Sequence, residues 1–231
     1  GNNFGMRLAK GEFLLFLNPD TIVEKNAILS LVQLAKQNLD YGIISCTTLN
    51  IEGKAEKEIR FFPKVSTFSG ITRAIYQRIN KREISEKFTK TKDVVFPDWV
   101  SGSLIFISKK WFELVDGWSE DYWLYFEDVD LCKRITDAGG KIALTRNASI
   151  IHNHGGSSRL NVKTSALTKT EVIISKHVYI NNHYNNNTRF FTHLIFLFFG
   201  LISKFLLAII GVVLFFIPKC YLQFLIFVNL V

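Results

Sequence analysis

Apolar and polar positions divide the first two thirds of the chain into short strand-like runs and longer stretches of helical spacing. The apolar runs lie at 13–17, 43–49, 94–99, 104–107, 141–145 and 148–151. Apolar residues recur three and four positions apart at about 22–37, after Ser108 and at 127–138, which predicts amphipathic helices there. Strands followed by helices indicate an α/β domain. The continuous run at 13–17 is typical of a strand buried on both faces of a parallel sheet.

Two other stretches have a different character. The polar stretch 54–93 has no clear periodicity, which indicates variable surface. The stretch 194–217 is almost continuously apolar and long enough to span a bilayer, and an Asn-rich linker is predicted at 181–188 before it. Lys204 is costly inside hydrocarbon, so the alternative is a helical hairpin with 222–231 in the membrane interface.

This pattern divides the 231 residues into three parts: an α/β domain at 1–160, a helix and polar linker at 161–193, and a membrane-associated segment at 194–231. The net charge of +8 would suit nucleic acid, an anionic membrane or a phosphate-bearing substrate. The basic residues are scattered, however, so no nucleic-acid partner is expected. The 3 cysteines have no zinc or disulfide spacing, which favours a reducing environment.

One candidate ligand directly follows the first predicted strand. Asp20 closes the turn that ends the run 13–17, and open α/β sheets bind ligands in the crevice beyond such strand ends. A carboxylate there can hold Mg²⁺ or Mn²⁺ together with substrate phosphates. The alternative is an ordinary turn that caps the following helix.

Two adjacent acids begin the predicted helix at 127–138. Glu127 and Asp128 follow an aromatic stretch in which Trp123 and Tyr125 are candidates for an acceptor pocket that stacks on a sugar ring. An acid buried beside aromatic side chains has a raised pKa, which suits a general base. The alternative is favourable acids in a helix first turn, with Asp130 and Arg134 forming a surface pair.

Two histidines end the last predicted strand, at His152 and His154, before a glycine pair. A neutral imidazole at this position could bind the same cation as Asp20. A solvated loop histidine is the alternative.

The order of four motifs resembles the family-2 glycosyltransferases of GT-A fold, particularly the rhamnosyltransferase-like branch that builds cell-surface polysaccharides. The segments that carry this resemblance are GEFLLFLNPDT at 11–21, DWVSG at 98–102, YFEDVDLC at 125–132 and HNHGGSS at 152–158. The resemblance implies a mostly parallel sheet flanked by helices. It also implies that donor and diphosphate binding involve Asn18, Asp20, Asp98 and Gly102.

The same resemblance implies an inverting, metal-dependent, hexosyltransferase-type enzyme. Asp128 would be the base with Glu127 as its partner, and Asp20 and His152 would hold the metal, with His154 as the alternative ligand. The expected partners are a nucleotide-diphosphate sugar, in which rhamnose is one candidate, and a glycan or lipid-linked glycan acceptor. The expected location is the inner membrane, with the catalytic part facing the cytoplasm.

Two departures from the family pattern change the expectations. Ser119 replaces an acid that the family usually has before the aromatic stretch. Gly1 matches a point after the family's first strand and nucleotide-binding segment, so we expect a domain incomplete at its N-terminus and impaired on its own. A non-catalytic remnant with a sugar-binding or membrane-assembly role is therefore the competing hypothesis. A nucleotidyltransferase would need a glycine-rich phosphate loop, which this sequence does not show.

Overall fold

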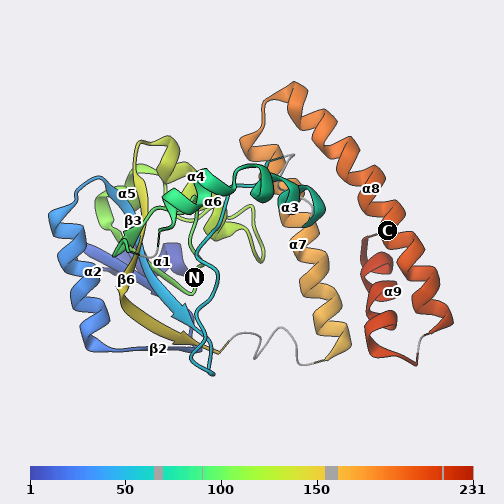
Figure 1. Ribbon diagram of the computed structural model, residues 1–231, viewed down its shortest axis with the longest axis horizontal. Helices are drawn as coiled ribbons and strands as arrows, with labels where there is room; N and C mark the ends of the chain where they lie inside the picture. Colours follow the sequence, from blue (N-terminus) through green and yellow to red (C-terminus); the bar gives the residue numbers. More distant parts are fainter. Residues whose placement is uncertain (65–69, 90, 154–160, 215, 231) are drawn as a thin grey trace. The chain divides into compact units, whose positions relative to one another are not determined.

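The computed structural model describes residues 1–64, 70–89, 91–153, 161–214 and 216–230 (Figure 1). The chain forms two compact units. The first contains the described residues of 1–119 and 127–153, and the second contains 120–126 and the described residues from 161 onward.

A mixed sheet is the centre of the first unit (Figure 1). Its strand order is β1 (Phe13–Leu17), β5 (Leu104–Ser108), β3 (Tyr41–Leu49), β6 (Lys141–His152) and β2 (Thr21–Val23), and β4 (Val94–Val95) also pairs with β6. Among the described strands, only the pairing of β3 with β6 is parallel. The α/β class is thus confirmed, and the prediction of a mostly parallel sheet is wrong for this part of the chain.

The strand β1 shows why the sequence misled. Its side chains alternate between two apolar clusters, with Leu14 and Phe16 in one and Phe13 and Leu15 in the other. The continuous apolar run therefore reflects the fact that side chains on both faces of β1 are packed against apolar clusters. Yet β1 lies at the edge of the sheet and runs antiparallel to β5. Burial on both faces does not determine whether a strand pairs parallel or antiparallel, because strand direction depends on the path of the connecting segments.

Helices cover the two faces of this sheet. The helix α2 (Lys25–Gln37) packs Leu31 and Ala35 against one face, and α5 (Lys109–Leu114) and α6 (Glu127–Asp137) pack against the other. Ser108 caps α5 by accepting a hydrogen bond from the Trp111 backbone N–H at 3.2 Å, as its sequence position predicts.

Close packing fixes α6 on the sheet. A Cβ atom on Gly42 of β3 would lie 2.3 Å from the Cγ2 atom of Ile135, so only glycine lets α6 approach this strand. Ile135 is fully buried at this contact. Because α6 carries the predicted acid pair at its first turn, the contact also helps to set the position of that pair.

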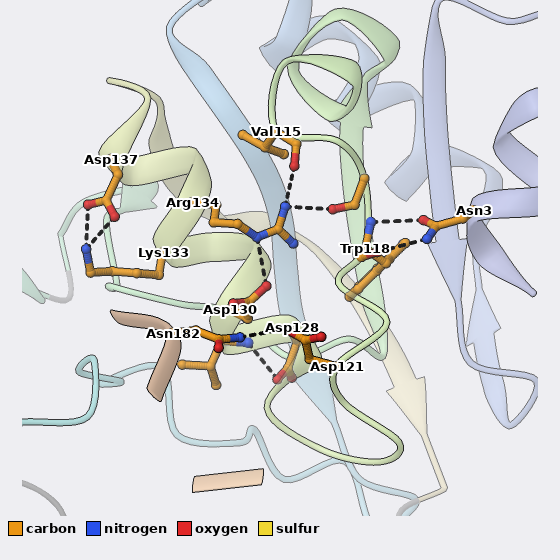
Figure 2. Close-up of polar contacts among 12 residues, drawn as sticks. Asn3, Val115, Trp118, Asp121, Asp128, Asp130, Lys133, Arg134, Asp137 and Asn182 are labelled. Carbon is orange, nitrogen blue, oxygen red and sulfur yellow. Dashed lines mark hydrogen bonds and ion pairs between the residues drawn. The ribbon is translucent and has the colours of Figure 1, made fainter. Parts of the chain in front are cut away.

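The described part of the first unit also contains the helices α1 (Asn2–Leu8), α3 (Gly70–Ile79) and α4 (Lys81–Lys87). The side chain of Asn3 ties α1 to the backbone of Trp118 by donating to its carbonyl at 2.8 Å and accepting from its N–H at 2.9 Å (Figure 2). The helices α3 and α4 lie within the stretch 54–93, which was predicted as variable surface because it has no clear periodicity.

The second unit consists of α7 (Val162–His183), α8 (Asn186–Val213), α9 (Pro218–Leu230) and the loop 120–126. Within it, Ser175 Oγ of α7 donates to the Leu124 carbonyl at 2.8 Å, and the Asn182 side chain donates to Asp121 at 2.9 Å. In the described part of the chain, no helix combines the length and apolarity needed to cross a membrane.

Candidate active site

The segment from Asp98 to Ser103 connects the predicted site residues of the first unit. The Gly102 backbone N–H donates to Asp128 Oδ2 at 3.0 Å, and the Asn18 backbone N–H donates to the Ser103 carbonyl at 3.1 Å. Asp98 Oδ2 accepts the Phe62 backbone N–H at 2.9 Å. The fold therefore joins the predicted donor segment to the acid pair on one side and to the end of β1 on the other.

The two adjacent acids have different surroundings. Asp128 accepts backbone N–H groups from Gly102 at 3.0 Å and from Val129 at 2.8 Å. Burial raises the pKa of Asp128, while these hydrogen bonds and the positive charge of Arg60 oppose the rise. Glu127 has a buried Oε2 atom with no hydrogen-bond partner among the described residues. Burial, and then the charge of Asp128, raises the pKa of Glu127 to about 7.

A buried ion pair stabilises the helix that carries these acids (Figure 2). Arg134 Nε donates to Asp130 Oδ2 at 2.8 Å, and its Nη1 group donates to the carbonyls of Val115 and Gly117. Asp130 is only 1% exposed. The alternative interpretation of Asp130 and Arg134 as a surface pair is therefore wrong, because the pair is buried and ties α6 to the loop that follows α5.

The backbone just before the acid pair is strained. Tyr125 and Phe126 have φ angles of 67° and 68°, in the left-handed region that bulky side chains rarely adopt. The Phe126 ring contacts Tyr179 of α7 edge-on, with centroids 5.8 Å apart. Strain of this kind persists only where the surroundings impose it, and it concentrates at functional sites. Trp123, the other predicted wall of an acceptor pocket, is 77% exposed.

The structure brings Asp20 and His152 together. His152 Nε2 lies 3.2 Å from Asp20 Oδ1 and 3.4 Å from the side-chain nitrogen of Asn18. The antiparallel pairing of β2 with β6 causes this approach, because it sets Thr21 opposite His152. His154, the alternative ligand, lies outside the described residues.

This pair suits a divalent cation bound together with a substrate. Cis ligands of an octahedral cation, each at about 2.1 Å, lie about 3 Å apart, close to the observed separation. Among the described residues no group of three His, Cys, Asp or Glu side chains forms a metal site. A cation that takes one or two protein ligands and completes its shell with phosphate and water, as Mg²⁺ does, needs only this pair.

The sequence did not point to the residues 56–62, which contact the donor segment. Arg60 stacks on the Trp99 ring at 4.7 Å and forms an ion pair with Glu56 at 2.9 Å. The one signal in this polar stretch is an arginine followed by Phe61 and Phe62. Phe61 and Phe62, which follow the arginine, are the apolar residues that pack this segment against the core cluster.

The chain is similar to curated proteins of known class. It is 29% identical over 148 residues to rhamnosyltransferase WbbL of Escherichia coli, covering 63% of this chain and 54% of that protein. It is also 29% identical over 157 residues to the low-salt glycan biosynthesis hexosyltransferase Agl10 of Haloferax volcanii, covering 66% of this chain and 47% of that protein. The chain thus spans about half the length of these relatives.

The homologues of this chain are therefore glycosyltransferases, among them rhamnosyltransferases and a glycan hexosyltransferase. A solved structure of GalNAc-T7 with UDP, GalNAc and Mn²⁺ is also similar, with a TM-score of 0.46 and 15% identity, over 74% of this chain and 33% of that one. No family model matches the chain.

Proposed function

We propose that this protein transfers a sugar from a nucleotide diphosphate to a hydroxyl group of a glycan or lipid-linked glycan. Rhamnose is a candidate sugar because relatives are named rhamnosyltransferases. The observation that carries the proposal is the hydrogen bond from Gly102 to Asp128, which joins the predicted donor segment to a half-buried acid pair. The relatives support the reaction class, and this geometry supports the assignment of residues.

The proposed reaction is a single displacement with inversion. Asp128 takes the proton of the acceptor hydroxyl, whose oxygen attacks the anomeric carbon as the bond to the diphosphate breaks. The hydrogen bonds from Gly102 and Val129 hold the carboxylate in one orientation. Glu127, with its pKa of about 7, holds a proton for part of the time at neutral pH and so limits the negative charge beside Asp128.

Asp20 and His152 are the proposed ligands of Mg²⁺ or Mn²⁺. When bound, the cation neutralises charge on the departing diphosphate. The Asp20 side chain is 37% exposed and reachable by a substrate, whereas His152 is nearly buried and held in place by β6.

The test of the function is transfer by the purified intact protein from a panel of nucleoside-diphosphate sugars to a glycan acceptor. Transfer that depends on Asp128 is the expected result. Donor binding without transfer under all conditions would instead support a non-catalytic remnant that binds sugar.

We further propose that the second unit associates with the inner membrane, with the catalytic part on the cytoplasmic side. The helix α8 exposes large apolar side chains at Phe190, Phe191, Phe198, Leu206 and Val213. Apolar surface of this extent is typical of membrane or protein contacts. Lys176 and Arg189 add positive charge, which favours the cytoplasmic face.

Vesicle flotation tests this association. The variants Phe198→Glu and Leu206→Glu should float less with anionic vesicles than the wild type. The matched control is Leu39→Glu, because Leu39 is 83% exposed in the first unit and should not matter. Equal flotation of all variants would contradict membrane contact through α8.

A further inference from the structure

The residues 60–62 are fastened to the donor segment by backbone and side-chain hydrogen bonds. The Asp98 backbone N–H donates to the Arg60 carbonyl at 3.0 Å, and the Phe62 backbone N–H donates to Asp98 Oδ2 at 2.9 Å. The indole N–H of Trp99 donates to the Phe61 carbonyl at 3.0 Å. These three bonds to Asp98 and Trp99 fix the backbone from the Arg60 carbonyl to Phe62.

The guanidinium of Arg60 is also held in one orientation. Its Nη2 group donates to Glu56 at 2.9 Å, its Nε donates to the Lys57 carbonyl at 3.1 Å, and its central carbon lies over the Trp99 ring, 4.7 Å from the centroid. The remaining Nη1 group makes no hydrogen bond with the described residues. The side chain keeps 19% of its surface exposed. A planar cation with one amino group left to donate is suited to an oxyanion, since little rotamer freedom remains to be lost on binding.

The charges around Arg60 indicate why an oxyanion would need it. Asp98 and Asp128 contribute negative charge to this part of the first unit, and Glu127 adds to it when ionised, which disfavours an anionic substrate. Arg60 is the cation whose charge acts against the raised pKa of Asp128, which places its positive charge within electrostatic reach of the acid pair. Its position on the segment next to Asp98 therefore offers local compensation for a substrate's negative charge.

We propose that the Nη1 group of Arg60 binds an oxygen of a diphosphate ester at the active site. This inference rests on the proposed transfer function, in which such an ester occurs in the nucleotide donor and in a lipid-linked acceptor. Its chemistry is the same in both cases, a charge-assisted hydrogen bond from a guanidinium to a phosphate oxygen.

The experiment measures binding to the intact protein by calorimetry at a fixed Mn²⁺ concentration. The probes are inorganic pyrophosphate, dTDP for the donor side and farnesyl diphosphate for the acceptor side. Arg60→Gln should weaken pyrophosphate binding about 10- to 100-fold, as expected for a lost hydrogen bond to a charged group. Arg60→Lys keeps the charge without the planar fork and should weaken it less. The control Arg82→Gln removes a 94% exposed arginine and should leave affinity within about twofold, because exposed charges are screened.

The two ester probes identify the source of the diphosphate. A loss confined to dTDP assigns Arg60 to the donor, and a loss confined to farnesyl diphosphate assigns it to the acceptor. Unchanged affinity of Arg60→Gln for every probe would overturn the inference. If that variant does not fold, unchanged affinity of Arg60→Lys for pyrophosphate overturns it equally. If the wild type transfers sugar and both variants bind the probes as the wild type does, only this inference is rejected. If the wild type never transfers sugar, the proposed function itself is rejected.

Discussion

Removing the charge of Asp130 should destabilise the protein far more than the same change at Asp137, two helical turns later in α6. Asp130 is 1% exposed and accepts from Arg134, whose other bonds hold the carbonyls of Val115 and Gly117. Asp130→Asn keeps the shape but leaves the guanidinium without its anion. A hydrogen bond to a charged group contributes about 1.5 to 3 kcal/mol, and Arg134 is 25% exposed, so we expect a loss of about 2 kcal/mol.

The same helix supplies the control. Asp137 forms an ion pair with Lys133 at the same spacing, but its side chain is 55% exposed (Figure 2). Asp137→Asn should therefore lower the free energy of unfolding by about 0.5 kcal/mol or less. Urea unfolding of both variants at constant pH gives the comparison. Equal losses would refute the account of a buried pair that holds α6 in place.

Three further predictions concern the same unit. Burial raises the pKa of Glu127 to about 7, above its usual value of 4.5, so ionising Glu127 disfavours the folded state. As pH rises from about 4.5 to 7, the wild type should therefore lose about 3 kcal/mol of unfolding free energy relative to Glu127→Gln. Urea unfolding across that range checks this, and a difference that stays constant would contradict it. Gly42→Ala should lower stability by about 1 to 3 kcal/mol through its clash with Ile135, whereas Gly5→Ala, which meets nothing within 4 Å, should not; similar melting of both variants would count against the clash. Asp20→Ala should abolish Mn²⁺-dependent binding of a nucleoside diphosphate in calorimetry, and unaltered binding would exclude Asp20 as a metal ligand.

Local features of the fold were predictable because neighbouring residues determine them. The bounds of β1 at Phe13–Leu17 and the Ser108 cap agree with the sequence pattern. Strand direction was not predictable in this way, since it depends on contacts between residues far apart in the chain. The antiparallel β1 and the single parallel pair of β3 with β6 show this limit.

The candidate site divides in the same way. Motif order indicated Asp20, Asp128 and His152, and the structure places Asp20 beside His152 through the pairing of β2 with β6. Arg60 was not indicated, because the stretch around it has no periodicity. The Arg60 carbonyl accepts the Asp98 backbone N–H, and the Arg60 guanidinium lies over the Trp99 ring. These partners are 38 and 39 positions further along the chain. Such contacts become visible only in the folded chain.

The central claim, that Asp128 is the base of an inverting sugar transfer, is tested most directly by the configuration and rate of product formation. Nuclear magnetic resonance of the product made by the intact protein should show an inverted anomeric centre. Asp128→Asn should bind the nucleotide sugar as the wild type does and transfer it about 100- to 10,000-fold more slowly. A product that retains the donor configuration, or an Asp128→Asn variant that transfers at the wild-type rate, would contradict the account.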